Sequence, residues 1–309
     1  MLSERNIIWG TGMKVDQYVS INELRVSLID EIIKSVGLPR TTFWRNVFSP
    51  IFWLPTDRFS RFGSNFDKLV AKSGFNKAIK NALAFFVGDV EVHGGDNVPK
   101  RGPLLVVSNH PGTYDAVVIA AQLPRDDVKI VSSDIPFIQN MRNANRHFLF
   151  TTRDTYKRMI VIKRAIRHLK SGGAILIFPS GHIDPEPAFM PDAMEELETW
   201  SRVVEIFFNK VPEIYIQVAI VSKVLSPKYM KNPLTRLRKE RRDRQRIAEF
   251  LQVIDQMVFR RKFHDIPKIT FAEAFGLKEI NESGRIKAVM PYVITRAKEM
   301  MALHIQADR

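Results

Sequence analysis

Short apolar runs that alternate with helix-like segments constrain the fold of this chain more than any other feature. Runs with the character of β-strands lie at 90–93, 104–108, 128–131, 146–151, 174–178 and 214–221. Segments with helical periodicity lie between them, at 114–122, 155–170 and 191–209. Strands that alternate with helices predict an α/β fold, in which a mixed, largely parallel sheet is flanked by helices.

The first part of the chain lacks this alternation. Helical periodicity at 20–36 and 66–86 predicts an N-terminal helical segment over 1–86, followed by an α/β domain over 87–309. Between the two helices, the stretch 43–55 contains two of the four tryptophans together with three phenylalanines, and basic residues lie in or near it at Arg40, Arg45, Arg58 and Arg61. Two interpretations stay open for it: a helix packed on the core, or an anchor at a lipid headgroup boundary.

The C-terminal part, 226–309, is expected to be basic and helical. Nine Lys and Arg residues against two acidic ones lie between Lys228 and Arg246. Pro233 is suited to the first turn of a helix. Apolar residues then recur at helical spacing, at Ile247, Phe250, Leu251, Ile254 and Val258. We therefore predict one long helix from 233 to 258, with a basic first half and an amphipathic second half.

The overall charge indicates a polyanionic partner. The formal net charge is +14 and the isoelectric point is near 10.0, which suits an anionic lipid surface, an acidic carrier protein, phosphorylated substrates or nucleic acid. The chain has no Cys, which excludes disulfides and thiolate metal sites. The first residues lack the apolar stretch of a signal peptide, and no apolar run approaches the length of a membrane-spanning helix.

A base and a carboxylate follow the strand-like run at 104–108. His110 can accept a proton near neutral pH, and Asp115 can orient its imidazole and stabilise the imidazolium ion. Such a pair can activate a substrate hydroxyl directly. This chemistry favours general-base catalysis over a covalent enzyme intermediate.

Four segments in order extend this pattern. They are Asn109-His110-x4-Asp115, Phe150-Thr151-Thr152-Arg153, Ile177-Phe178-Pro179-Ser180-Gly181 and the Pro-containing apolar run at 211–219. In order and spacing they resemble the conserved blocks of the glycerolipid acyltransferase superfamily, over roughly residues 85–225. The resemblance implies that His110 is the general base, that Asp115 holds its imidazole, and that Arg153 binds a phosphate of the acceptor.

The third segment departs from the family pattern. Ser180 stands where the family has Glu, and no Arg follows Gly181 at the expected position. A second cation for the phosphate must then come from elsewhere, and Lys157 is one candidate. The resemblance also places Asn109, Gly112, Ser180 and Gly181 at the substrate-binding site, where backbone amides near either glycine can stabilise an oxyanion.

The resemblance implies an O-acyltransferase that moves a fatty acyl group from acyl-ACP or acyl-CoA to glycerol-3-phosphate or a lysophosphatidate-type acceptor. No cofactor and no metal are expected, although His182 and Asp184 have the chemistry of metal ligands. We expect a cytoplasmic protein, peripheral on the inner face of the cell membrane, with no specific nucleic acid partner. The alternative is a non-catalytic member that binds lipid or membrane, or one that acts on another polar-lipid acceptor.

Overall fold

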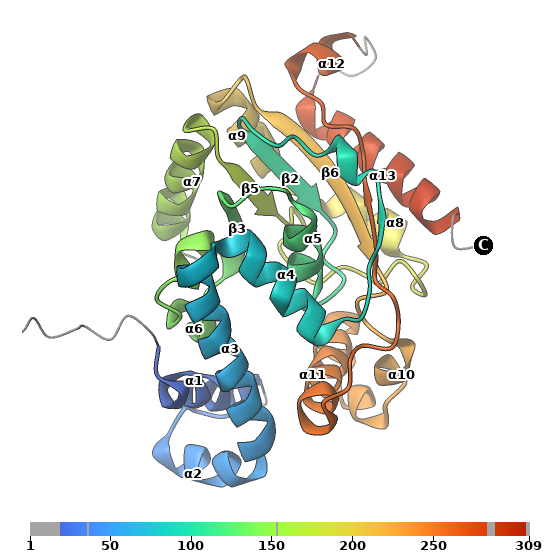
Figure 1. Ribbon diagram of the computed structural model, residues 1–309. Coiled ribbons are helices and arrows are strands. Elements are labelled where there is room, and N and C mark those ends of the chain that lie inside the picture. The colour runs from blue at the N-terminus through green and yellow to red at the C-terminus, as the bar shows by residue number, and fades with distance from the viewer. Residues whose placement is uncertain (1–18, 36, 153, 283–287, 307–309) are drawn as a thin grey trace, which may run out of the picture.

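A seven-stranded sheet forms the centre of the molecule in the computed structural model, which describes residues 19–35, 37–152, 154–282 and 288–306 (Figure 1). The strand order is β1-β7-β6-β2-β5-β3-β4. The strands are β1 (Glu91–His93), β2 (Leu104–Ser108), β3 (Val128–Ser133), β4 (Phe148–Thr151), β5 (Ala174–Ile177), β6 (Tyr215–Ser222) and β7 (Lys268–Phe271). Only β6 and β7 pair antiparallel. The predicted mixed, largely parallel sheet is therefore confirmed.

Helices precede the sheet and cover both of its faces. The N-terminal helices are α1 (Ile21–Ser35), α2 (Thr42–Ile51), α3 (Trp53–Ser73) and α4 (Phe75–Phe86). The later ones are α5 (Asp115–Gln122), α6 (Pro136–Gln139), α7 (Thr155–Lys170), α8 (Ala193–Glu196), α9 (Val203–Lys210), α10 (Pro227–Met230), α11 (Arg241–Phe259), α12 (Leu277–Glu282) and α13 (Val289–Gln306). Short 3-10 helices are η1 (Gly95–Asn97), η2 (Ala144–His147), η3 (Leu197–Thr199) and η4 (Pro233–Leu237).

The core has two halves, one on each face of the sheet. Leu104 and Val106 of β2 point into a cluster shared with α4 and α5, whereas Leu105 and Val107 point into a cluster shared with α7, α9 and α13. All four side chains are fully buried. Four apolar residues in a row, as at 104–107, are typical of a strand in a parallel sheet covered on both faces. This explains why residues 104–108 could be identified as a strand from sequence.

The position of β2 determines where the candidate site lies. It pairs in parallel with both β5 and β6, with Val107 opposite Ile177 and Val218. The carboxyl ends of these three strands therefore lie at one edge of the sheet. Ligands of α/β proteins bind at such edges.

Two predicted helices are interrupted in the structure. The helix expected over 66–86 divides at Gly74, whose φ of +84° is in the left-handed region, so α3 ends at Ser73 and α4 begins at Phe75. The helix expected over 191–209 divides into α8, η3 and α9, because the backbone at Trp200 is extended (ψ +126°) and its side chain is buried in the core.

The long helix predicted from 233 to 258 is also wrong in its first part. Residues 233–237 form η4, the backbone at Arg238 and Glu240 is extended, and the helix α11 begins only at Arg241. Positive charges at 236, 238, 239, 241 and 242 would lie one turn apart on a continuous helix. Like charges at that spacing disfavour a continuous helix.

The aromatic stretch 43–55 forms α2 and the start of α3 at the surface. One side contacts a small cluster of α1 residues, Ile29, Ile32 and Ile33, yet no residue of α2 itself is buried. The opposite side exposes 65% of Phe43, 66% of Ile51 and 51% of Trp53. One side thus packs on a buried cluster while the other is exposed, so packing on the core and anchoring at a lipid surface are compatible. Among the described residues, no helix combines the length and the apolar character needed to cross a bilayer.

Candidate active site

The chain leaves β2 through an asparagine that bonds to the neighbouring strand. The side-chain Nδ2 of Asn109 donates to the Val221 carbonyl oxygen at 2.8 Å, and the Val221 N–H donates to Asn109 Oδ1 at 2.9 Å. Asn109 is buried, so both of its polar atoms are used in joining β2 to β6. This fixes the backbone immediately before His110.

His110 and Asp115 lie in direct contact, as the sequence predicts. Nδ1 of His110 is 2.6 Å from Oδ2 of Asp115, and the Gly112 N–H donates to the same oxygen at 3.1 Å. Asp115 is fully buried in the first turn of α5, where the helix dipole favours a negative charge. An ionised carboxylate only accepts hydrogen bonds. We infer that Nδ1 carries the shared proton and that Nε2 is the reactive nitrogen of His110.

The imidazole of His110 is fixed on its other side by an aromatic ring. Phe178, which follows β5, stacks on it with a centroid distance of 4.4 Å and an interplanar angle of 24°. The His110 side chain keeps 30% of its surface exposed. The ring is therefore held in one orientation while remaining open to a substrate.

Carboxylates around His110 control its protonation. Burial opposes the charged imidazolium, but the charge and hydrogen bond of Asp115, together with Glu249 and Asp184, raise the pKa of His110 to about 9. At pH 7 only about one imidazole in a hundred is then neutral. His110 must lose this proton before it can act as a base.

The third segment supports the backbone of His110. Asp184 accepts a hydrogen bond from the His110 N–H at 2.8 Å through Oδ2, and its own N–H donates to the His110 carbonyl at 2.8 Å. Ser180 Oγ donates to the carbonyl of His182 at 3.0 Å, next to Gly181 at φ +70°. The structure therefore brings the Ser180 loop against the His110 backbone.

Helix α11 adds polar contacts that the sequence analysis missed. Its most buried side chains include four polar residues on one stripe, Gln245, Glu249, Gln252 and Gln256. Gln245 donates to the Pro111 carbonyl at 2.6 Å, and Thr113 Oγ1 donates to Glu249 at 2.6 Å. The apolar residues expected to face the core, such as Phe250 and Ile254, are only half-buried. In the sequence, only the recurrence of Gln and Glu at helical spacing, at 245, 249, 252 and 256, indicates that this side of α11 is distinct.

Glu249 is an unusual group beside the 109–115 turn. Its Oε1 is buried without a hydrogen-bond partner among the described residues. A Cβ at Gly112 would lie 3.8 Å from this oxygen. Burial raises the pKa of Glu249 to about 7. A second carboxyl group, from a distant part of the chain, therefore lies next to the His110–Asp115 pair.

A charged cluster borders the Ser180 loop. Ligand atoms of His182, Asp184 and Glu196 lie within 4.8 Å of one another, a spacing that could hold a metal ion. However, Nη2 of Arg242 is 2.7 Å from His182 Nε2 and 3.1 Å from Glu196 Oε1, and Arg241 also pairs with Glu196. Burial alone would raise the pKa of Glu196, but these partners lower it. Arginine guanidinium groups thus supply the cation here, and the sequence expectation of no metal stays a prediction.

Of the two cations expected at the acceptor phosphate, the structure describes only Lys157. Arg153 lies outside the described residues. Lys157 is exposed on α7, where its N–H donates to Asp154 at 2.8 Å. The preceding strand, β4, is three positions from β2 in the sheet, which corresponds to about 14 Å. The structure places Lys157 at the same edge as His110 but does not bring the two into contact.

The amides expected to stabilise an oxyanion are engaged within the protein. The Gly112 N–H donates to Asp115, and the Gly181 N–H donates to the Phe178 carbonyl at 3.0 Å. Both bonds maintain turns that shape the site. Either amide must exchange its partner before it can bind a substrate oxygen.

A comparison with protein families identifies the family of this chain. The model of the Acyltransferase family matches residues 89–258, which include the four segments. Among solved structures, the chain is similar to the 1-acyl-sn-glycerophosphate (LPA) acyltransferase PlsC from Thermotoga maritima, with 16% identity and a TM-score of 0.42 over 92% of this chain and 96% of that one. No curated protein sequence matches significantly.

Proposed function

Because the chain belongs to the Acyltransferase family and is an acyltransferase, we propose that it moves a fatty acyl group from a thioester donor to the hydroxyl of a glycerol-based polar lipid. The donor is acyl-ACP or acyl-CoA. The acceptor is glycerol-3-phosphate or a lysophosphatidate-type lipid. The match confirms the family to which the four segments point.

The contact between His110 and Asp115 is the observation that carries this proposal. Nε2 of His110 removes the proton from the acceptor hydroxyl as its oxygen attacks the thioester carbonyl carbon. Asp115, at 2.6 Å from Nδ1, stabilises the imidazolium that forms. The carbon–sulfur bond then breaks, and the imidazolium returns the proton to the thiolate that leaves. This step needs no covalent enzyme intermediate and no cofactor.

The basic residues after β4 are proposed to bind the acceptor phosphate. A guanidinium binds two phosphate oxygens at once, which suits Arg153 to this contact. Lys157, one turn into α7, adds a second positive charge at the same edge of the sheet. Ser180 and Gly181 lie on the loop after β5, whose Asp184 bonds to the His110 backbone, and they are proposed to contact the acceptor head.

The exposed side of α2 supports action at an anionic membrane surface. Five large apolar side chains are exposed together on α2 and the start of α3: Phe43, Val47, Ile51, Trp53 and Leu54. The guanidinium of Arg25 lies 4.2 Å from the Trp53 ring centroid. Aromatic and aliphatic side chains beside arginines are typical of helices that lie in the lipid headgroup region. We propose that this side of the molecule binds the inner face of the cell membrane.

Product identification by mass spectrometry tests the function. Purified protein is incubated with acyl-ACP or acyl-CoA and a panel of glycerol-based acceptors, with His110→Ala in parallel. His93→Ala is the matched control, since His93 is exposed on β1 and pairs with Glu91. We expect acyl transfer by wild type and by the control, and loss in His110→Ala.

A non-catalytic lipid-binding role is the second candidate, favoured by Ser180 in place of Glu. It predicts no acyl transfer with any donor and acceptor, together with binding to anionic liposomes that survives His110→Ala. That pair of results would overturn the catalytic proposal.

A further inference from the structure

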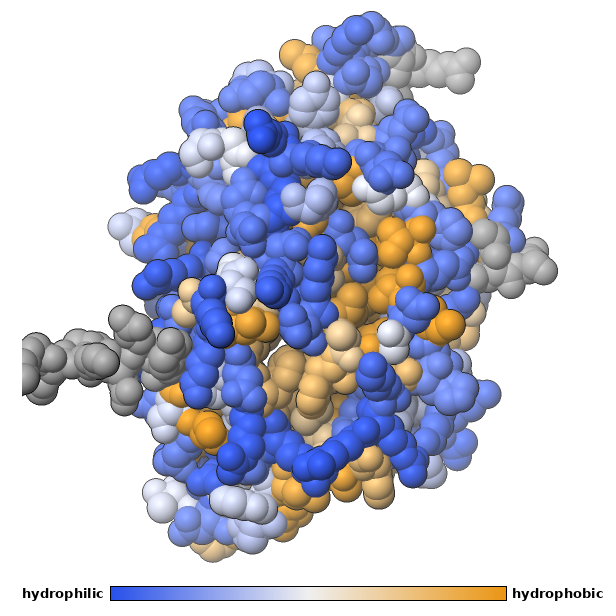
Figure 2. Space-filling view, in the orientation of Figure 1, coloured by the Kyte–Doolittle hydropathy of each residue, from blue (hydrophilic) through white to orange (hydrophobic). Residues whose placement is uncertain are grey.

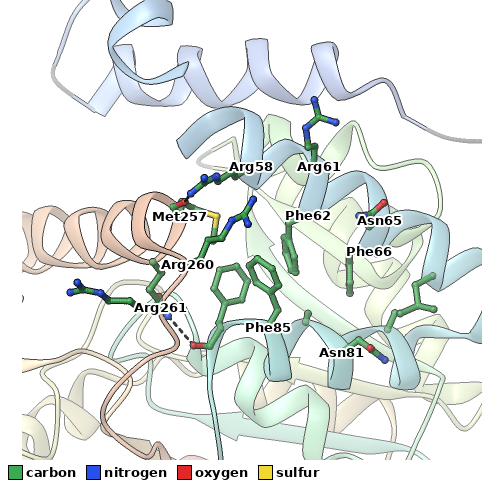
Figure 3. Close-up of a pocket in the computed structure, with 15 residues that line it drawn as sticks. Arg58, Arg61, Phe62, Asn65, Phe66, Asn81, Phe85, Met257, Arg260 and Arg261 are labelled. Carbon is green, nitrogen blue, oxygen red and sulfur yellow. Dashed lines mark hydrogen bonds between the residues drawn. The ribbon is translucent and has the colours of Figure 1, made fainter. Parts of the chain in front are cut away.

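A cavity of about 480 Å³ opens between α3, α4 and the end of α11. Figure 2 shows it as a hydrophobic hollow bordered by hydrophilic side chains, and Figure 3 shows the residues around it. Its volume is in the range of known ligand pockets. No residue of the 109–115 turn lines it, so it is a separate feature from the candidate active site.

Phenylalanine rings form the apolar lining of this cavity. Phe62 contacts Phe85 and Phe86 at centroid distances of 4.9 and 4.8 Å, and Phe66 and Leu69 continue the same surface. Phe85 remains 50% exposed. Exposed rings gathered in a concave surface favour an apolar occupant, because covering them removes apolar area from water.

Arginines surround the opening. Arg58, Arg61, Arg260 and Arg261 line the cavity, and no Asp or Glu among the described residues does so. Arg58 bonds to the carbonyls of Met257 and Val258, and Arg61 pairs with Asp57. Within the described part of the chain, Arg260 and Arg261 form no salt bridge with a carboxylate. The guanidinium of Arg261 lies over the Phe259 ring, 5.0 Å from its centroid, and extends away from the cavity (Figure 3). The charge of Arg260 is therefore the one available to an anion at the opening.

We propose that this cavity binds a single-chain anionic amphiphile. Its hydrocarbon chain lies against Phe62, Phe66 and Phe85, and its carboxylate or phosphate head contacts Arg260. Apolar lining with cations only at the edge matches this division of the ligand into chain and head. A neutral lipid would leave the arginines without a partner, and a small anion would leave the phenylalanines in water.

The cavity also contacts the catalytic region through one shared residue. Gln256 lines the cavity, donates to the Phe86 carbonyl at 2.8 Å, and accepts a hydrogen bond from the Tyr114 hydroxyl. Tyr114 immediately precedes Asp115 and its ring contacts Phe86. The amphiphile would thus lie beside the residues that hold α5 in place, without occupying the site of His110.

Binding of a fluorescent polyene fatty acid, below its micelle concentration, tests the proposal without any acyl transfer. We expect saturable binding of one equivalent by wild type and by His110→Ala. Phe85→Asp should weaken binding by about tenfold or more, because it puts a carboxylate against the hydrocarbon. Phe43→Asp is the matched control on α2, where Phe43 is 65% exposed and does not line the cavity, and it should bind as wild type does.

The head group is tested with the corresponding fatty alcohol. Wild type should prefer the acid, and Arg260→Asn, which tolerates the positive φ of 54° at this position, should reduce that preference. Displacement of the probe by lysophosphatidate identifies a phosphate head as a further ligand, whereas displacement by fatty acids alone limits the site to carboxylates. Absence of saturable binding, equal binding by Phe85→Asp, or equal binding of acid and alcohol would overturn the proposal. Because none of these measurements needs turnover, failure here is distinct from failure of the proposed function.

Discussion

The 109–115 turn and helix α2 use their side chains in opposite ways. In the turn, Asn109 and Asp115 are buried and direct their polar atoms to partners within the protein. In α2, no residue is buried, and Phe43, Val47 and Ile51 point to solvent. The side chains of the turn therefore have their partners within the protein. The exposed apolar side of α2 has none among the described residues.

Removing the base from the turn should have the largest effect. His110→Ala is expected to lower kcat/KM by a factor of about 10²–10⁴, the usual contribution of a general base. Because the substitution also removes the cation beside the buried Asp115 carboxylate, the free energy of unfolding should fall as well. Steady-state assays with thermal unfolding check both. Wild-type activity in a folded His110→Ala protein would show that the turn is structural only.

Removing apolar side chains from α2 should weaken binding to membranes rather than catalysis. Phe43→Ser together with Ile51→Ser is expected to lower partition into anionic vesicles by about tenfold or more, since each side chain contributes on the order of 1 kcal/mol or more when buried in lipid. Activity on a water-soluble acceptor should persist. Vesicle sedimentation measures the change, with Phe259→Ser, an exposed substitution on α11, as control. Equal loss in the control would mean that α2 has no special role.

A smaller change tests the electrostatics of the turn. Since His110 has a pKa of about 9 and acts in its neutral form, kcat/KM should rise with pH and level off above about 9. The negative charges that face it are Asp115, Glu249 and Asp184. Glu249→Gln removes one charge while keeping an acceptor for Thr113, so the rise should move to lower pH. Profiles of kcat/KM against pH measure it, and an unchanged or higher midpoint would contradict the prediction.

The smallest expected effect concerns how α2 is attached. Arg45 Nε and Nη2 each lie 2.7 Å from an oxygen of Asp30 on α1. This pair is partly exposed, and such pairs contribute at most about 1 kcal/mol. Arg45→Met should lower the free energy of unfolding by no more than that, as urea denaturation can measure. A much larger loss would indicate that α2 is part of the core, contrary to its exposure.

Local patterns predicted the sheet and the contact at its edge. The continuous apolar run at 104–108 indicated a strand covered on both faces, and the contact between His110 and Asp115 followed from a spacing of five residues. Both depend on neighbouring residues only. The helix breaks at Gly74 and Trp200 were harder to predict, because periodic apolar residues continue on either side of each break.

The hydrogen bonds between α11 and the 109–115 turn could not be predicted from local patterns. Polar residues on a predicted helix are normally assigned to solvent, so Gln245, Glu249 and Gln256 were not expected to be buried. They are buried because backbone and side-chain groups of distant segments, such as the Pro111 carbonyl and Thr113, require hydrogen-bond partners there. Those partners are known only once the tertiary structure is known.

The two hydrogen bonds between Asn109 and Val221 limit which residues can stand at position 109. A carboxamide has the same donor and acceptor as a peptide group, so the Asn109 side chain bonds to both the N–H and the carbonyl of Val221 on β6, beyond the last paired residue of β2. The main chain is thereby free to turn away toward His110 while both backbone groups of Val221 keep a partner. Asp at this position would lack the donor, and Leu would lack both. Position 109 is where a side chain takes over the role of the backbone.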